Sequence, residues 1–157
     1  MSSVVRVVKN AFSIELTVTT VIDRPATQVW AVLVDTDRWR EWNPFVTEFV
    51  GKLVPGVRVA VTLQLPGRKA YQMRPRVVEV NENRSFAWLG SLGFRGVFDG
   101  RHHFEVRPVS LQTCELIQHE RLGGALVPMF RSMITGPTAS AFVALNEACK
   151  ERVEVDA

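Results

Sequence analysis

The spacing of apolar and polar residues changes along the chain and predicts the elements in order. Residues 13–22, SIELTVTTVI, alternate in polarity and are rich in β-branched side chains, which is typical of a strand. After Pro25, the apolar residues of ATQVWAVLVD fall on one face of a helix. A second short helix carries Trp39 and Trp42, and Asn43-Pro44 ends it.

Beyond this point, the period of two returns and continues to residue 122. We predict six strands, separated by turn-forming residues, at 45–53, 57–65, 69–80, 85–92, 97–107 and 111–122. Short connections favour an antiparallel meander, and the strand at 13–22 can pair with it to give seven strands. After Gly123-Gly124 a helical period continues to the end of the chain, and Gly136-Pro137 should kink or divide that helix.

This order predicts an α+β fold. A curved seven-stranded antiparallel sheet would leave a large apolar face in water unless another element covered it. The C-terminal helix is the only predicted element large enough, so we expect it to lie across the sheet, with the two short helices between the first and second strands. We interpret residues 1–157 as one domain, with its core at about 13–153.

Four segments carry a resemblance to a known superfamily. They are ATQVWAVLVDTDRWREWNPFV, GVFDGRHHFEV, IQHERLGG and FVALNEACKERVE. In this order, the chain resembles the START-related, polyketide cyclase-like superfamily with the helix-grip fold. The resemblance implies a sheet that grips a long helix, with a cavity between them for an apolar or amphipathic small molecule. It implies no single chemistry, because the superfamily includes carriers, receptors, cyclases and dehydratases.

Composition narrows the class of protein. The 19 basic residues exceed the 16 acidic ones only slightly and form no dense run, so we expect no nucleic-acid partner. Cys114 and Cys149 lack metal-ligand spacing and are expected to stay reduced as apolar filling. No signal peptide or membrane-spanning run is found, so we expect a cytoplasmic protein without an integral membrane segment. We expect no cofactor, and both a monomer and a homodimer remain open.

Turn positions predict which side chains face the interior. A turn at Pro66–Arg68 pairs Leu63 with Tyr71 and Val61 with Met73. The apolar face then includes Val57, Val59, Val61, Leu63, Leu65, Tyr71, Met73, Pro75 and Val77. Arg58, Arg74 and Arg76 point outward, and we interpret them as a solvated face.

The last two predicted strands carry polar residues inward. With a turn at Pro108–Ser110, His102 lies opposite about residue 116, and His102, Gln118 and Glu120 share the inner face with Phe98, Phe104, Cys114 and Leu116. His103 and His119 fall on the opposite face as surface residues. One inward histidine and one glutamate are too few ligands for a metal site.

Two interpretations of the inward polar residues remain open. A buried carboxylate is costly unless it is paired, reaches water or keeps its proton. In the functional interpretation, His102 and Glu120 orient a ligand or transfer a proton. In the structural one, His102 bonds a neighbouring strand or a water, and Glu120 tethers the loop before the long helix.

Aromatic residues and loops complete the prediction. Trp39 and Trp42 are expected to plug one end of the curved sheet, with a ligand platform as the alternative. The strand at 85–92 aims either Phe86 and Trp88 or Ala87 and Leu89 inward, and we favour the bulkier pair. The loops at 65–69 and 92–96, which carry Arg68 and Arg95, should flank the cavity entrance.

These features support three hypotheses for function. The preferred one is a binding protein for a small hydrophobic ligand such as a lipid, isoprenoid or polyketide-like aromatic. The expected ligand-binding residues are Val59, Val61, Leu63, Tyr71, Met73, Trp88, Phe98, Phe104, Leu116, Gln118, Phe130 and Met133. The second is a cofactor-independent cyclase or dehydratase that uses His102 and Glu120 as an acid–base pair, with Gln118 or Tyr71 orienting the substrate oxygen. The third is a protein-interaction module.

Overall fold

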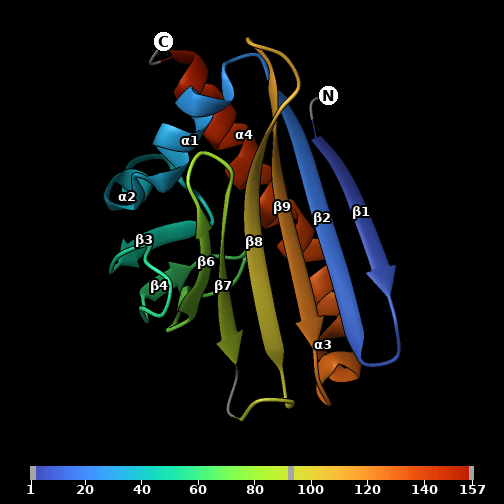
Figure 1. The fold of residues 1–157 in the computed structure, drawn as a ribbon. Coiled ribbons are helices and arrows are strands. Elements are labelled where there is room, and N and C mark those ends of the chain that lie inside the picture. Colours follow the sequence, from blue (N-terminus) through green and yellow to red (C-terminus); the bar gives the residue numbers. More distant parts are fainter. Residues whose placement is uncertain (1–2, 92–93, 156–157) are drawn as a thin grey trace.

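The structure of the chain is a computed structural model. It describes residues 3–91 and 94–155, apart from the side chain of Met133. Within this part of the chain, nine strands form two antiparallel sheets (Figure 1). The larger sheet has the order β1 (Ser3–Lys9), β2 (Ser13–Ile22), β9 (Cys114–Gly123), β8 (Asp99–Pro108), β7 (Ser85–Ser91) and β6 (Arg76–Asn81). The smaller sheet consists of β3 (Val46–Val50), β4 (Ala60–Leu63) and β5 (Tyr71–Met73).

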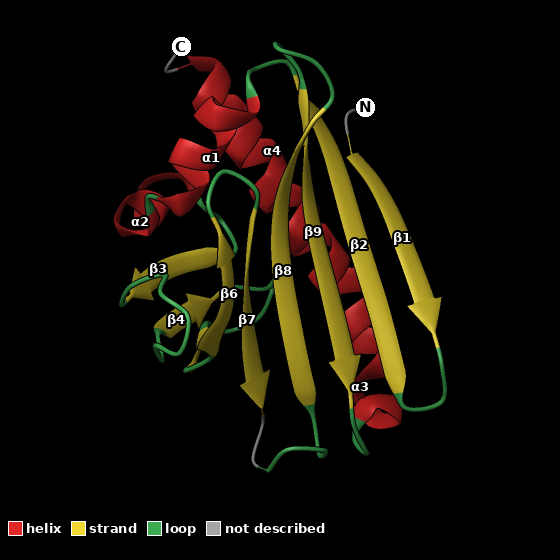
Figure 2. Cartoon of the chain, in the orientation of Figure 1, coloured by secondary structure: helices red, strands yellow, loops and turns green. Residues whose placement is uncertain are grey.

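Helices cover one face of the larger sheet. Helix α1 (Ala26–Val34), a 3₁₀ turn (Thr36–Arg38) and α2 (Trp39–Trp42) follow β2. The C-terminal helix comprises α3 (Val127–Met133), a π-helical segment (Ile134–Thr138) and α4 (Ala139–Val155), and it runs across the sheet behind β8, β9 and β2 (Figure 2). The α+β arrangement of an antiparallel sheet around a long C-terminal helix is therefore as predicted, and the helix is divided at Gly136-Pro137.

Two strands differ from the prediction. Residues 3–9, which we did not predict to be a strand, form β1 and pair along their whole length with β2. Their sequence, SVVRVVK, contains paired valines and so lacks the alternation by which a strand is identified. The predicted strand at 69–80 divides into β5 and β6 around Pro75, which has no N–H to donate within a continuous ladder. The single seven-stranded sheet of the prediction is thus two sheets.

The predicted facing of the side chains is confirmed. Leu63 pairs with Tyr71 as expected, whereas His102 pairs with Glu120 rather than with a residue near 116. The register is shifted by four residues because the β8–β9 turn occupies residues 109–113. Since four is even, the inward set is unchanged. In β7, Phe86 and Trp88 are the inward pair and are buried.

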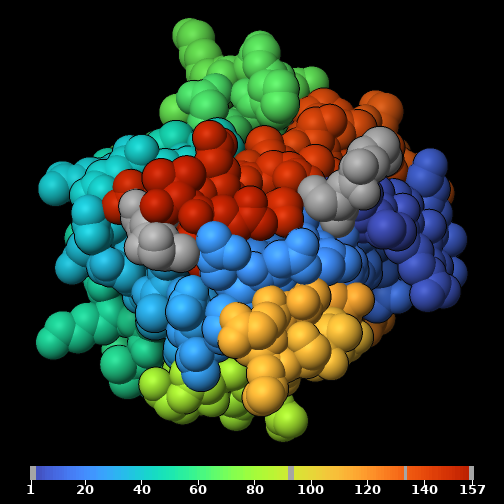
Figure 3. Space-filling view, turned by 90° about the horizontal axis from the view of Figure 1, so that it is seen from above, coloured from blue at the N-terminus to red at the C-terminus, as the bar shows by residue number. Residues whose placement is uncertain are grey.

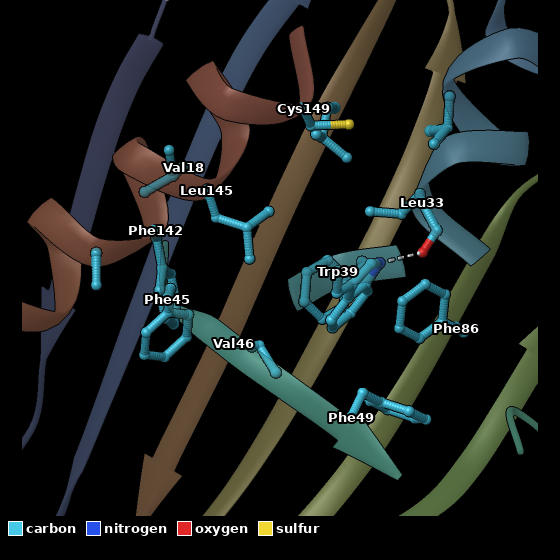
Figure 4. Close-up of a cluster of buried hydrophobic side chains, with 14 of the residues drawn as sticks. Val18, Leu33, Trp39, Phe45, Val46, Phe49, Phe86, Phe142, Leu145 and Cys149 are labelled. Carbon is cyan, nitrogen blue, oxygen red and sulfur yellow. Dashed lines mark hydrogen bonds between the residues drawn. The ribbon is translucent and has the colours of Figure 1, made fainter. Parts of the chain in front are cut away.

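The two short helices close one end of the sheet. Trp39 is completely buried, and its indole Nε1 donates a hydrogen bond to the carbonyl oxygen of Leu33, 3.0 Å away (Figure 4). Its ring contacts Phe49, Phe86 and Phe104 at centroid distances of 5.5–6.4 Å. We call this region the packed end. The tryptophan plug was predicted from the sequence.

The same end is sealed by contacts between distant parts of the chain. Seen from above in Figure 3, the end of α4 (red) lies against the segment that joins β2 to α1 (blue). Arg24, in that segment, donates a hydrogen bond to the carbonyl oxygen of Glu154 over 3.1 Å. The packed end is therefore closed, and any cavity in the interior lies away from it.

Candidate functional site

A cavity of about 530 Å³ lies between the larger sheet, β5 and the C-terminal helix. This volume falls in the ordinary range of small-molecule sites. Eight of the residues predicted to be catalytic or ligand-binding line it: Leu63, Tyr71, Met73, Trp88, Phe98, His102, Glu120 and Phe130. The surface of the cavity is mostly apolar, with the histidine and the glutamate as its inner polar groups.

Five other residues expected to bind ligand do not line the cavity: Val59, Val61, Phe104, Leu116 and Gln118. All five are buried and have their neighbours within the protein. The reason is that the packed end extends over them, so an inward side chain there contacts core rather than open volume. The side chain of Met133 lies outside the described residues.

Glycines explain why the other end of the sheet is hollow. Gly90 of β7 pairs directly with Gly100 of β8, both on the inner face. Toward the packed end, the next inward-facing pair is Trp88 with His102, and the one after it is Phe86 with Phe104. Large rings thus fill the interior at one end, whereas at the other the two glycines carry no side chain, and the ends of Met73 and Glu120 lie against them beside the open volume. We call the region around Gly90, Gly100, Phe98 and Phe130 the hollow end.

Sequence reasoning missed several cavity residues. Phe45 follows the short helices, whereas Ile134, Thr138 and Phe142 come from the C-terminal helix. Ile134 and Thr138 belong to the π-helical segment, a feature that often occurs at functional sites. The glycines on the inner faces of the predicted strands were the available signal, because a glycine at an inward position leaves volume unfilled.

His102 and Glu120 form a direct pair at the inner end of the cavity. Nδ1 of His102 lies 3.0 Å from Oε2 of Glu120. The histidine side chain is almost fully buried, whereas that of Glu120 remains 14% exposed. The imidazole is held between the rings of Phe104 and Phe142, at centroid distances of 4.3 and 4.6 Å. Its position is therefore fixed by packing as well as by hydrogen bonds.

A chain of amides behind the pair fixes the orientation of the imidazole. Nδ2 of Asn146 donates to the carbonyl oxygen of Leu116 over 3.2 Å, so Oδ1 of Asn146 is the acceptor that faces Gln118. Nε2 of Gln118 donates to that oxygen over 2.8 Å and to the carbonyl oxygen of Phe142 over 2.9 Å. Both hydrogens of the Gln118 amide are then used, and its Oε1 faces Nε2 of His102 at 2.9 Å. An amide oxygen only accepts, so His102 carries a proton on Nε2.

This tautomer determines what the pair presents to the cavity. With Nε2 protonated, Nδ1 bonds Glu120 either as part of a charged imidazolium facing a carboxylate or as an acceptor facing a carboxylic acid. In both states one proton lies between the two side chains. Because both nitrogens of His102 are occupied, Glu120 is the member of the pair that can contact a ligand. A Cβ atom added at Gly100 would lie 2.7 Å from Oε1 of Glu120, so this glycine makes room for the carboxyl group.

The structure also separates the two residues proposed to orient a substrate oxygen. Gln118 is fully buried behind His102 with all its hydrogen-bonding groups engaged, so it has no group left for a substrate. Tyr71 lines the cavity. Partial burial and the nearby charge of Glu120 raise the pKa of the Tyr71 phenol, so the hydroxyl stays protonated and can donate a hydrogen bond at neutral pH.

The predicted entrance loop borders the cavity. Leu65, Arg68 and Lys69 line it, and the side chain of Gln64 donates to the carbonyl oxygens of Leu65 and Arg68. The loop therefore places two positive charges at the edge of an apolar volume. In the second predicted loop, Leu92 and Gly93 lie outside the described residues.

Within residues 3–91 and 94–155, no group of three or more His, Cys, Asp or Glu side chains is placed to hold a metal ion. His103 and His119 pair on the outer face of the sheet, as expected. None of the helices in the described residues has the length and apolarity that crossing a membrane requires.

Comparisons with known proteins bear on the family. The model of a family described as polyketide cyclase/dehydrase and lipid transport matches residues 13–154. No curated protein gave a significant match. Among solved structures, the Zhui aromatase/cyclase from Streptomyces sp. R1128 is similar with a TM-score of 0.74 and 15% identity, over 90% of this chain and 94% of that one.

Two further structures share the fold. A START superfamily protein from Mycobacterium smegmatis aligns with a TM-score of 0.72 and 15% identity, over 91% of this chain and 99% of that one. Norcoclaurine synthase from Thalictrum flavum, in complex with dopamine and hydroxybenzaldehyde, aligns with a TM-score of 0.68 and 14% identity, over 98% and 89%. At such identities the structural likeness shows the fold alone, whereas the family model covers most of the chain. The chain belongs to the polyketide cyclase/dehydrase and lipid transport family, and it has the helix-grip fold.

Proposed function

We propose that the protein binds a small, mostly apolar molecule in the cavity, with one oxygen function of the ligand directed at Glu120. The observation that carries this proposal is the combination of about 530 Å³ of apolar volume with a single inner polar pair. Aromatic rings from Trp88, Phe98 and Phe130 favour a flat, aromatic or polycyclic ligand. The family description and the aromatic ligands of norcoclaurine synthase support the same ligand class.

The direct experiment is native mass spectrometry of the purified protein, followed by organic extraction and identification of any molecule that travels with it. Gly90→Phe is the test variant, because its ring would project from the inner face into the cavity. Val78→Phe is the matched control, since Val78 is exposed on β6 outside the cavity. We expect bound molecules in the wild type and in Val78→Phe, and none in Gly90→Phe. Equal recovery from all three would contradict cavity binding.

A second candidate function is a cofactor-independent cyclase or dehydratase. The observation that favours it is the 3.0 Å contact between His102 and Glu120 on the cavity wall. As a carboxylate beside an imidazolium, Glu120 removes a proton from a carbon next to a ligand carbonyl. Tyr71 donates a hydrogen bond to that carbonyl oxygen as negative charge develops there.

Dehydration then completes the reaction without a cofactor. The proton taken up by Glu120 is returned to the departing hydroxyl group, which leaves as water while a carbon–carbon double bond forms. His102 does not contact the substrate in this scheme. It is a positioning residue that holds Glu120 and balances its charge.

Glu120→Gln separates the two functions. The amide keeps the shape of the side chain but cannot accept the substrate proton. If the protein is an enzyme, the variant retains binding of the recovered compound and loses turnover, measured as the appearance of a product lighter by one water. Glu105→Gln, on the same strand pair but facing outward, is the control. A compound that wild-type protein returns unchanged would favour a carrier.

A further inference from the structure

A second, separate cavity lies on the outer face of the larger sheet. It measures about 380 Å³ and is lined by Arg58, Arg76, Leu89, Ser91 and Arg95. Leu89 alternates with Trp88 and Gly90 along β7, so it projects away from the hydrophobic cavity, whereas Ser91, at the end of the strand, borders both cavities. We call this surface the arginine cleft. Arg58 and Arg76 were interpreted from the sequence as part of a solvated face and Arg95 as part of a cavity-entrance loop, but the three enclose a common volume.

Two of the arginines are held in place by the protein. Arg58 and Arg76 are partners in a single antiparallel bridge, so their side chains lie next to each other. Nη1 of Arg58 donates to the carbonyl oxygen of Arg74 over 2.8 Å, and Nη1 of Arg76 donates to that of Gly56 over 2.7 Å. Each guanidinium has five N–H donors, so most of them remain available after these contacts. The guanidinium groups of Arg58 and Arg76 are therefore held in place before any ligand binds.

The cleft carries unbalanced positive charge. Like charges placed directly opposite each other on neighbouring strands are destabilising. No acidic residue lines the cleft, and no salt bridge to Arg58, Arg76 or Arg95 is present among the described residues. Asp99, which pairs with Ser91 across the strands, offsets part of the charge of Arg95, and its Oδ2 already accepts the N–H of Gly96.

Neighbouring charges on the same face are arranged differently. Arg101 pairs with Leu89 across β7 and β8, and its Nη2 lies 3.3 Å from Oε2 of Glu79. Among the residues that the structure describes, a carboxylate thus pairs with Arg101 and none pairs with Arg58 or Arg76. A bound anion would supply the missing negative charge.

We propose that the arginine cleft binds a phosphate-type oxyanion, through the forked guanidinium groups of Arg58 and Arg76. Planar guanidinium groups match the oxygen geometry of phosphate, and several N–H donors can bond one anion at once. Leu89 forms an apolar wall of the cleft, and the hydroxyl group of Ser91, which also lines it, is hydrogen-bonded to Asp99. The anion is either a free phosphate compound or the phosphate of a lipid headgroup.

The first arm of the test uses inorganic pyrophosphate and isothermal titration calorimetry at physiological ionic strength. We expect wild-type protein to bind, and Arg58→Gln and Arg76→Gln each to weaken binding about tenfold or more, as expected for a lost charge-assisted hydrogen bond. Both arginines are exposed, so both variants should fold. Arg6→Gln, an exposed residue of β1, is the control for net charge and should bind as the wild type does.

The second arm distinguishes the source of the phosphate. Vesicles of phosphatidylcholine with phosphatidic acid, which has a phosphomonoester headgroup, are compared by co-sedimentation with vesicles of equal charge made with phosphatidylglycerol. Binding to phosphatidic acid that the double variant Arg58→Gln/Arg76→Gln abolishes supports a lipid headgroup. Pyrophosphate binding without vesicle binding supports a free phosphate compound.

Two outcomes would overturn the proposal. One is the absence of both pyrophosphate and vesicle binding by the wild type. The other is an equal loss of affinity in Arg6→Gln, which would indicate attraction by net charge only. Thermal unfolding without any anion provides a check on the physical argument. Arg58→Gln should be as stable as the wild type or more so, because it removes a like-charge contact, and a marked loss of stability would contradict the argument. None of these measurements depends on the hydrophobic cavity.

Discussion

The two ends of the sheet interior are built from the same strands and differ in what those strands carry. At the packed end, Trp39, Phe86 and Phe104 contact one another and leave no room for a ligand. At the hollow end, the paired glycines Gly90 and Gly100 occupy the same face of the same two strands. Backbone pairing is continuous through both ends. The cavity is therefore a consequence of side-chain size, and no break in the sheet is needed to make it.

The packed end therefore supplies most of the stability of the fold, whereas the hollow end supplies the surface for a ligand. Ring packing and complete burial at one end contribute most to the free energy of unfolding. Residues at the other end keep part of their apolar surface open to a ligand and contribute less. His102 lies on the boundary, stacked on Phe104 of the packed end and bonded to Glu120 of the hollow end.

The largest expected effect comes from removing the central ring of the packed end. Trp39→Ala should lower the free energy of unfolding by about 3–5 kcal/mol, because it leaves a cavity and removes the hydrogen bond to Leu33. Phe130→Ala, at the hollow end, should cost only about 1 kcal/mol, since Phe130 is half-buried. Urea denaturation measures both. Equal costs would mean that the two ends do not differ as described.

A smaller effect is expected from pH. Burial raises the pKa of the Cys149 thiol to about 12 and that of Cys114 to about 11, from 9.0. Above pH 9 the unfolded chain loses these protons while the folded protein keeps them. The free energy of unfolding should therefore fall above pH 9, and between pH 9 and 11 the thiol of Cys149 alone should account for about 1.4 kcal/mol per pH unit.

The matched variant for this prediction is Cys149→Ala. Stability should be measured by urea denaturation between pH 8 and pH 11 for both proteins, because other groups also titrate there. We expect the variant to be less stable at pH 8 but to lose stability less steeply above pH 9. Parallel pH dependences would show that the thiol of Cys149 makes no contribution.

The next largest effect on the free energy of unfolding is expected from a substitution in the glycine pair. Gly100→Ala places a Cβ atom 2.7 Å from Oε1 of Glu120, so the carboxyl group must move and its contact with His102 is disturbed. We expect a loss of about 1–3 kcal/mol, as for other overpacked sites. Gly136→Ala is the control, since nothing lies within 4 Å of the added atom and alanine favours helix. A neutral Gly100→Ala would mean that the hollow end has space to spare beside Glu120.

The smallest effect is spectroscopic and concerns the boundary residue. Long-range ¹H–¹⁵N NMR of the imidazole should show His102 with its proton on Nε2, as the amide chain through Gln118 and Asn146 requires. His119, on the outer face, where its Nε2 lies 3.6 Å from Oε1 of Glu15, is an internal reference. A neutral His102 protonated on Nδ1 alone would refute the proposed amide orientation.

The fold followed largely from the sequence because the period of the apolar residues changes cleanly between strands and helices. Strand β1 was missed because paired valines conceal its alternation, and it is recognisable only through its pairing with β2. The division at Pro75 was visible as a proline within a strand pattern, but the sheet that each half joins depends on contacts with residues distant in the sequence.

The sequence predicted which side chains of the candidate site face the interior, but it did not predict where the cavity begins and ends. The alternation of polar and apolar residues alone placed His102 and Glu120 on the inner face. The predicted register was wrong by four residues, but an even shift leaves each side chain on the same face of the sheet. The position of the open volume depends on how far Trp39 and its neighbours extend from the packed end, which no local pattern encodes. Asn146 was also missed, although it falls among the buried residues Phe142, Leu145 and Cys149 of α4.

The pairing of Gly90 with Gly100 has a consequence for how such a protein diversifies. A substitution at either position changes the shape offered to a ligand while the rings that hold the molecule together stay as they are. Selection for a new small molecule can then proceed through exchanges at these two positions, provided that the neighbouring end of Met73 or Glu120 moves aside. Members of a lineage built in this way can diverge in ligand preference while keeping one architecture.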